Sequence, residues 1–298
     1  MDFKNYLVPG KTGLLIGIGG VSMSPLAEVL HDAGLDIRGS DMAESSNTLT
    51  LREHGIPIHI GHSADNVTDD ISFVIRTAAV HDDNPEVHEA HRRGIPVFER
   101  TQAWGALMRG YQNALCISGT HGKTTTTSMC THIMMAAEKD PTVMIGGTLP
   151  LLKACHRVGK GNTIIMESCE YYNSFLALNP TIAVVLNIEA DHLDFFKDLE
   201  DIKHSFRCFA ERVPAETGTV IANYDDANTM DALRGIARKV ITFGLNAKAD
   251  VYAQNIVHRG SVSEFDIYHR GNYFARVTLH VPGIHNVRNA LAATAAAI

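Results

Sequence analysis

A glycine-rich loop between an apolar run and a helical segment constrains the fold of this chain more than any other feature. The loop, GTHGKTTTT at residues 119–127, follows the apolar residues 114–117 and precedes a helical pattern at residues 128–135. Strand, glycine loop, Lys-Thr and helix in this order are typical of a phosphate-binding loop. Glycines let backbone N–H groups approach phosphate oxygens, and the helix N-terminus adds partial positive charge. We therefore expect an α/β nucleotide-binding domain here.

The loop departs from the complete pattern at one position, because Ile117 stands where a glycine is expected. Lys123 is expected to reach the terminal phosphates, and the hydroxyl of Thr124 is expected to ligate Mg²⁺. The alternative is a glycine-rich turn that caps a helix and binds nothing. The strand and the helix on either side favour nucleotide binding. The predicted nucleotide-binding residues of the loop are Gly119, Thr120, His121, Gly122, Lys123, Thr124 and Thr125.

Apolar runs alternate with helical segments along the first third of the chain. Strands are expected at residues 14–18, 35–38, 56–60, 71–75 and 95–98, and helices at residues 25–33 and 85–93. This alternation predicts βαβ units and a parallel sheet. With 298 residues the chain has room for about two domains. We expect a Rossmann-like domain over residues 1–113 and a second, ATP-binding domain over residues 114–298.

The second part of the chain repeats the pattern and then changes character. Strands are expected at residues 163–166, 181–186, 220–222 and 240–243, with a helix at 199–212. Residues 251–253, 263–268 and 273–281 predict a small antiparallel sheet, with a turn at 270–272. A final helix begins near residue 285, and the chain stops inside its alanine-rich run. A stop without a helix cap leads us to expect that the second domain is truncated.

A second glycine loop lies near the N-terminus, in GIGGVS at residues 17–22. It is similar to the Rossmann dinucleotide pattern, with Ser22 in place of the third glycine, and Asp41 follows the next strand, where a carboxylate commonly binds ribose hydroxyls. Gly17, Gly19, Gly20, Ser22 and Asp41 are therefore predicted to hold a nucleotide diphosphate. NAD is not required by this geometry, and the alternative is a tight turn without a ligand.

Two further side chains follow predicted strands of the second domain. Glu167 closes the strand at 163–166, and His192 lies beyond the strand at 181–186. Because the carboxyl ends of parallel strands meet at one ligand crevice, Glu167 is expected to hold Mg²⁺ with His192 beside it. Mg²⁺ prefers oxygen ligands, so His192 is the less expected ligand. A solvated carboxylate and a hydrogen-bonded structural histidine are the alternatives.

Four other residues carry weaker expectations. Asn286 and Asn289 share one face of the last helix, where either could bind an adenine edge or cap the helix. Cys169 is expected to be a small buried thiol, and Trp104 a core or interface residue.

Composition limits the classes of partner. The net charge is −7 without a long basic run, so nucleic acid is not an expected partner. Five cysteines, an odd number without a CxxC pair, indicate reduced thiols in the cytoplasm. The N-terminus lacks the apolar region of a signal peptide, and no apolar stretch approaches 18 residues, so no membrane partner is expected. No oligomeric state is predicted.

Six motifs in order resemble the Mur ligases of peptidoglycan synthesis. They are GIGGVSMSPLAEVL, GSD at 39–41, GTHGKTTTT, ESCE, NIEADHLDFF and PGIHNVRNALAA, and the resemblance extends over about residues 14–298. The resemblance implies an ATP-dependent amide ligase that uses Mg²⁺. Within the family, it favours the type that joins L-alanine to UDP-N-acetylmuramate through an acyl phosphate.

The resemblance also implies roles for the residues singled out above. Lys123 would neutralise the β- and γ-phosphates, Thr124 and Glu167 would hold one Mg²⁺, and His192 would hold a second metal ion. Asn286 and Asn289 match positions that contact adenine. The loop at 17–22 and Asp41 match the region that holds the UDP-sugar.

Three alternatives stay open. One is a murein-tripeptide recycling ligase, which shares the phosphate loop. Another is a non-catalytic nucleotide or UDP-sugar binding module. An NAD-dependent oxidoreductase is disfavoured, because such enzymes have no use for the Lys-Thr loop. Mur ligases have a third domain for which these 298 residues leave no room, so we expect the chain alone to bind its ligands without ligating them.

Overall fold

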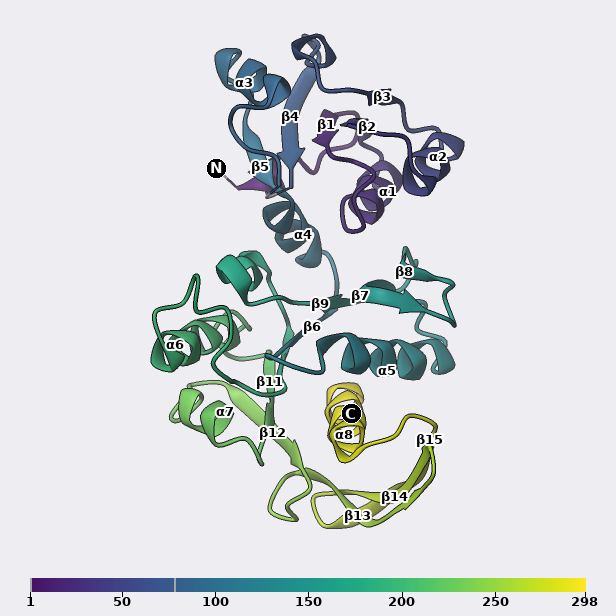
Figure 1. Ribbon diagram of the computed structural model, residues 1–298, viewed down its shortest axis with the longest axis vertical. Helices are drawn as coiled ribbons and strands as arrows, with labels where there is room; N and C mark the ends of the chain where they lie inside the picture. Colours follow the sequence, from purple (N-terminus) through teal and green to yellow (C-terminus); the bar gives the residue numbers. More distant parts are fainter. Residues whose placement is uncertain (1, 78) are drawn as a thin grey trace. The chain divides into compact units, whose positions relative to one another are not determined.

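The computed structural model describes residues 2–77 and 79–298 and divides into two compact units, Met1–Gly110 and Tyr111–Ile298. Each unit is a β-sheet covered by helices (Figure 1). The α/β class expected from the sequence is confirmed in both units. In the part of the chain that the structure describes, no helix is long and apolar enough to cross a membrane.

The first unit is a five-stranded sheet with the order β3-β2-β1-β4-β5, and every pair of neighbours is parallel. Its strands are β1 Thr12–Ile16, β2 Asp36–Asp41, β3 Ile58–Ile60, β4 Ile71–Arg76 and β5 Val97–Glu99. Its α-helices are α1 Ser24–Asp32, α2 Ser46–Glu53, α3 Pro85–Arg92 and α4 Arg100–Met108, and its 3₁₀ helices are η1 Phe3–Tyr6 and η2 Ala64–Asn66. All five residues of β1, the central strand, are buried, which explains the apolar run of Leu14, Leu15 and Ile16.

The second unit contains a ten-stranded sheet with the order β15-β14-β13-β12-β11-β10-β6-β9-β7-β8. Its strands are β6 Asn113–Ser118, β7 Thr142–Leu149, β8 Ala154–Arg157, β9 Thr163–Glu167, β10 Ile182–Val185, β11 Thr219–Asn223, β12 Lys239–Gly244, β13 Val251–Arg259, β14 Val262–His269 and β15 Asn272–Leu279. Its α-helices are α5 Lys123–Ala136, α6 Leu199–Ala210, α7 Ala227–Ala232 and α8 Ile284–Ala297, and η3 Tyr171–Ala177 is a 3₁₀ helix.

The helices of the second unit lie on two faces of its sheet. Helices α5 and α8 pack against each other on one face, and α6 and α7 cover the other (Figure 1). The core beneath α8 contains Val287 and Leu291 together with buried residues of the central strands, such as Ile117 and Val184. This packing places the start of α5 and the start of α8 near the carboxyl ends of the central parallel strands.

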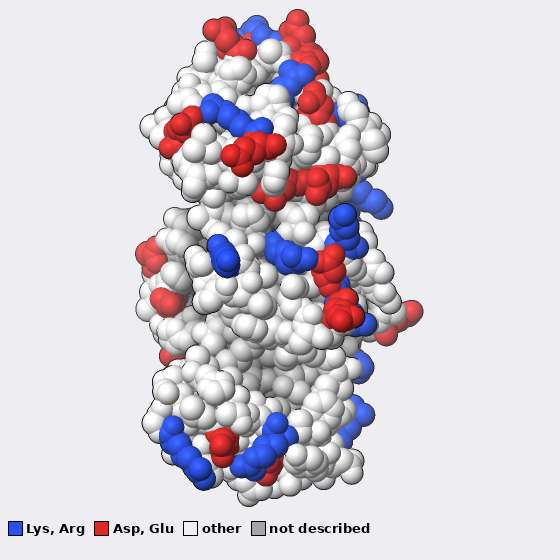
Figure 2. All heavy atoms as spheres, turned by 90° about the vertical axis from the view of Figure 1, so that its right-hand side faces the viewer, with Lys and Arg blue, Asp and Glu red and all other residues white. Residues whose placement is uncertain are grey.

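The structure differs from the sequence-based expectations mainly at one edge of this sheet. Strands β7 and β8 were not expected; β7 pairs parallel with β9 and antiparallel with β8. The expected antiparallel strands are present, but β13 also pairs with β12, so they extend the main sheet. Figure 2 shows that charged side chains of both signs are interspersed on one face of the molecule, with an uncharged, hollowed area in the larger unit.

Candidate functional site

The phosphate loop connects β6 to α5 and depends on two glycines. Gly119 and Gly122 have φ angles of 142° and 88°, which side-chain-bearing residues rarely adopt. A Cβ atom at Gly122 would lie 2.7 Å from Oδ1 of Asn289. The backbone conformation at both positions, and the lack of room for a side chain beside Asn289, therefore require glycine. The loop backbone stays open to an incoming phosphate.

Asn187, two residues after the end of β10, fixes the conformation of this loop. Its Oδ1 accepts a hydrogen bond from His121 N at 2.7 Å, and its Nδ2 donates to His121 O at 2.9 Å. The N–H of Thr120 donates to Asn187 O at 3.1 Å. Sequence analysis assigned no role to Asn187, although its position after a predicted strand was a usable signal. Thr125 lies half-buried in the first turn of α5.

Lys123 is folded back over its own loop. Its Nζ donates to Gly119 O at 2.6 Å and to Thr120 O at 3.2 Å. It also lies 3.1 Å from Oε2 of Glu170, a carboxylate that sequence analysis did not single out. Glu170 is the second acidic residue of ESCE, so its spacing from Glu167 was the available signal. The lysine is thus placed at the loop centre, where phosphate oxygens bind in such loops.

Thr124 and Glu167 meet beside the loop. The hydroxyl of Thr124 donates to Oε1 of Glu167 at 3.0 Å, and Gly146 N donates to Oε2 at 2.7 Å. A hydroxyl and a carboxylate are the hard oxygen ligands that Mg²⁺ prefers. Because the carboxylate is already oriented by a backbone N–H, the pair fits a magnesium ion.

The structure does not bring His192 into this pair. Its ring stacks on Tyr171, with centroids 4.4 Å apart, and its backbone is left-handed, with φ 52°. The hydroxyl of Tyr171 donates to Asp194, and this bond raises the pKa of the phenol. Over residues 2–77 and 79–298, no group of three His, Cys, Asp or Glu side chains is placed to share a metal ion. The role of His192 as a metal ligand stays a prediction.

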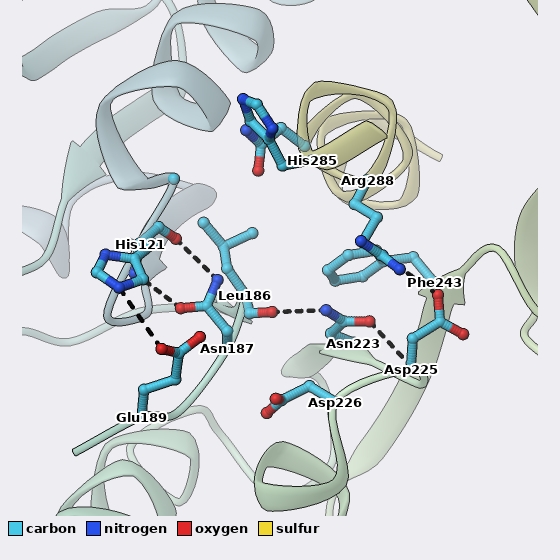
Figure 3. A pocket seen from close by; sticks show the side chains of 12 residues that line it. His121, Leu186, Asn187, Glu189, Asn223, Asp225, Asp226, Phe243, His285 and Arg288 are labelled. Carbon is cyan, nitrogen blue, oxygen red and sulfur yellow. Dashed lines mark hydrogen bonds and ion pairs between the residues drawn. The ribbon is translucent and has the colours of Figure 1, made fainter. Parts of the chain in front are cut away.

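A cavity of about 510 Å³ opens beside the phosphate loop (Figure 3), a volume within the usual range of small-molecule sites. Its wall combines the loop with the ends of central strands and the start of α8. It is lined by His121, Gly122, Leu186, Asn187, Glu189, Asn223, Asp225, Asp226, Phe243, His285, Arg288 and Asn289. Figure 3 shows Arg288 reaching from α8 toward Asp225, with Nε 3.5 Å from Oδ2. Sequence analysis missed this ion pair and Phe243.

Asn286 and Asn289 of α8 lie differently with respect to this cavity. Asn289 lines the cavity, whereas Asn286 does not. Nδ2 of Asn289 donates to Oδ1 of Asn286 at 3.1 Å, and Nδ2 of Asn286 donates to Pro282 O at 2.6 Å. Asn286 therefore orients Asn289 from behind, and Asn289 is the better placed of the two to meet a base.

The glycine loop of the first unit closes on Asp41. Gly19 N donates to Oδ2 of Asp41 at 2.8 Å, and Gly17 has φ 76°. Gly20 N donates back to Gly17 O at 3.1 Å. Ser22 accepts a hydrogen bond from Arg100 through its hydroxyl, and its carbonyl accepts from the buried Trp104. Asp41 thus braces the loop, in addition to its predicted contact with ribose hydroxyls.

Cys169 lies between Glu167 and Glu170 and is exposed, so the expectation of a buried thiol is wrong. Cys116 and Cys130 are buried instead, and burial raises the pKa of each thiol to about 12. Burial also raises the pKa of the Cys169 thiol, so its greater reactivity depends on its exposure. We therefore expect iodoacetamide to modify Cys169 and to spare Cys116 and Cys130 in the folded protein.

Peptide mass spectrometry of the folded protein checks this order of reactivity, with the unfolded protein as the control for complete labelling. Mg·ATP bound to the neighbouring loop is expected to slow the modification of Cys169. Rapid labelling of Cys116 or Cys130 under native conditions would contradict the burial described here.

Two family models match the chain and together cover most of it. The model for the Mur ligase middle domain matches residues 117–297, and the model named Mur ligase family, catalytic domain, matches residues 15–112.

Curated relatives carry the name UDP-N-acetylmuramate–L-alanine ligase. The relative from Agathobacter rectalis is 46% identical over 281 residues, which are 94% of this chain and 61% of the relative. The relative from Clostridium novyi is 44% identical over 298 residues, which are 100% of this chain and 64% of the relative. The chain therefore spans somewhat more than three fifths of the length of these relatives.

Two solved structures are similar over nearly the whole chain. The UDP-N-acetylmuramate–alanine ligase of Thermotoga maritima has a TM-score of 0.78 and 31% identity, covering 95% of this chain and 64% of the other. The UDP-N-acetylmuramate:L-alanyl-γ-D-glutamyl-meso-diaminopimelate ligase of Neisseria meningitides has a TM-score of 0.84 and 26% identity. The match covers 97% of this chain and 93% of the other.

Proposed function

This chain belongs to the Mur ligase family, and we propose that it supplies the ATP-binding and UDP-sugar-binding parts of an enzyme that joins L-alanine to UDP-N-acetylmuramate. The observation that carries the proposal is the arrangement around the phosphate loop. Lys123, Thr124 and Glu167 converge there beside a cavity of about 510 Å³. The names of the curated relatives support the choice of substrates. The five cysteines suit a cytoplasmic location.

The proposed reaction has two chemical steps. A carboxylate oxygen of UDP-N-acetylmuramate bonds to the γ-phosphorus of ATP as the bond to the β–γ bridging oxygen breaks, giving an acyl phosphate and ADP. The amino group of L-alanine then attacks the acyl carbon, phosphate leaves, and the nitrogen loses a proton. Charge stabilisation and positioning account for most of the protein's part in phosphoryl transfer.

The residues of this chain have distinct roles in the proposal. Lys123 neutralises charge on the β- and γ-phosphates, and the backbone of residues 119–122 holds the phosphate oxygens. Thr124 and Glu167 would hold Mg²⁺, which supplies a positive charge beside the transferred phosphate. Asn289, oriented by Asn286, is proposed to bind the adenine edge. His192 is proposed to hold a second metal ion.

The glycine loop of the first unit is proposed to hold the diphosphate of the UDP-sugar. Gly17, Gly19 and Gly20 form its backbone, Ser22 lies at its end, and Asp41, the last residue of β2, accepts from Gly19 N. The proposal assigns this ligand to residues 1–113 and the nucleotide to residues 114–298.

A murein-peptide recycling ligase is the second candidate. It is favoured by the backbone similarity to the Neisseria enzyme, whose TM-score of 0.84 exceeds the 0.78 of the Thermotoga enzyme. The names of the curated relatives, at 44–46% identity, favour L-alanine as the added group. Supplying L-alanine or the tripeptide as acceptor to a ligating form of the protein distinguishes the two.

A substitution at Gly19 tests the assignment of the UDP-sugar. A Cβ atom there would lie 2.8 Å from Cγ2 of Thr48 and 3.0 Å from Oδ2 of Asp41, so Gly19→Val distorts the loop. We expect calorimetry to show at least about a tenfold loss of affinity for UDP-N-acetylmuramate. Affinity for Mg·ATP should stay unchanged, and it serves as the internal control. Equal losses for both ligands, or unaltered UDP-sugar binding, would contradict the assignment.

A further inference from the structure

We propose that Glu170 is a positioning residue for Lys123 and makes nucleotide binding at this loop depend on a divalent cation. The inference rests on the proposed ATP-binding role of the site. In this inference Glu170 holds the phosphate-binding lysine. Its negative charge determines when the phosphates of a nucleotide can take the place of Glu170 beside Lys123.

The geometry around the lysine is a closed set of contacts. Nζ of Lys123 lies 3.1 Å and 3.3 Å from the two oxygens of Glu170, and it donates to the carbonyls of Gly119 and Thr120. An ammonium group has three donors. The chain's own acceptors therefore occupy all of them, and an incoming phosphate must compete for the lysine.

Burial makes this pair different from an ordinary surface ion pair. The side chain of Glu170 is 3% exposed and that of Lys123 is 15% exposed. Water and salt screen such a pair less than a surface pair, so the carboxylate acts more strongly on a charge at the loop centre than an exposed carboxylate would. By contrast, His121 and Glu189 at the loop rim have side chains 66% and 58% exposed.

The charges at the loop centre add up to an excess of negative charge. Glu167 and Glu170 are two carboxylates, and Lys123 is one ammonium. A polyphosphate that enters without a cation meets the negative charge of Glu170. At this point phosphate-binding loops usually present positive charge. A divalent cation held by Thr124 and Glu167 reverses that balance, and the phosphate then draws Lys123 away from Glu170.

Removal of the Glu170 charge should therefore relax the requirement for a cation. Glutamine keeps the shape of the side chain and can still accept a hydrogen bond from Lys123. The affinity for ATP without a cation should rise, while the affinity for Mg·ATP should change less. The ratio of the two affinities isolates this effect from any general weakening of the loop.

The experiment measures ATP affinity of the whole chain by calorimetry, once with Mg²⁺ and once with EDTA. The ratio of the two affinities is expected to fall by about tenfold or more in Glu170→Gln relative to the unaltered chain. Glu170→Asp, which keeps the charge, should retain most of the ratio. Glu216→Gln removes an exposed carboxylate of the same unit and should leave the ratio unchanged.

The possible outcomes are distinct. Equal loss of affinity with and without Mg²⁺, at a constant ratio, would overturn the inference and leave Glu170 as a structural partner of Lys123. If circular dichroism shows that Glu170→Gln is unfolded, Glu170→Ser removes the same charge, leaves room for water and must show the same fall in ratio. Failure of the unaltered chain to bind ATP both with Mg²⁺ and with EDTA would contradict the proposed function and, with it, this inference.

Discussion

Lys123→Ala is expected to weaken binding of Mg·ATP by roughly tenfold to a hundredfold, the usual value of a hydrogen bond to a charged group. In any form of the protein that ligates, we expect the rate of ligation to fall at least about a hundredfold. The physical reason is the loss of the positive charge that faces the β- and γ-phosphates. Calorimetry reports the affinity, and release of ADP reports the rate.

The substitution leaves the buried carboxylate of Glu170 without its ammonium partner, so circular dichroism must show that the variant is folded before its affinity is compared. Lys139→Ala is the matched control, since Lys139 is an exposed lysine just beyond the end of α5. It should bind Mg·ATP as the unaltered chain does. A Lys123→Ala protein with near-normal affinity and turnover would contradict the assignment of the phosphate loop.

Glu167→Gln is expected to raise the Mg²⁺ concentration needed for half-maximal ATP binding by about tenfold or more, because it removes the charge of a metal ligand. The amide keeps the volume of the side chain. Its one oxygen can accept from Gly146 N while its NH2 group donates to Thr124 Oγ1, so the local structure should persist. A titration of Mg²⁺ at fixed ATP, followed by a fluorescent nucleotide, measures the shift.

The two acidic residues of the ESCE segment should therefore respond in opposite directions. Loss of the Glu167 charge makes a cation harder to bind, whereas loss of the Glu170 charge makes it less necessary. A Glu167→Gln protein with an unaltered Mg²⁺ requirement would show that the metal ion is held elsewhere, and Glu216→Gln again controls for net charge.

The expected strands that were confirmed share a simple pattern. β1 and β6 each contain a short apolar run, residues 14–16 and 114–117, and a glycine loop follows each strand at once, so local sequence is sufficient to identify them. β7 was missed because Gly146 and Gly147 interrupt its pattern. A Cβ atom at Gly146 would lie 2.6 Å from Oε1 of Glu167. The glycine that obscures the strand is thus required by the carboxylate beside it, which lies 21 residues away.

In the candidate site, too, residues of one local motif could be predicted, whereas contacts between distant segments could not. Lys123 and Thr124 belong to one continuous motif. The family resemblance implied the pairing of Thr124 with Glu167, and the fold does bring these two side chains together. The argument from strand ends placed His192 beside Glu167, where the structure does not bring it. The pairing of Arg288 with Asp225 joins segments 63 residues apart, and no local pattern announces it. For His192, the stacking on Tyr171 depends on a left-handed backbone that sequence alone does not indicate.

The central claim, that one chain holds a UDP-sugar site and a separate ATP site, is tested most directly by sequential calorimetric titration of the unaltered protein. UDP-N-acetylmuramate is added first, Mg·ATP is added to the saturated sample, and the order is then reversed, with NAD as the competing ligand in a parallel series. The account predicts one site for each substrate, with neither displacing the other, and no competition by NAD. Binding of NAD in place of UDP-N-acetylmuramate, or displacement of one substrate by the other, would contradict it.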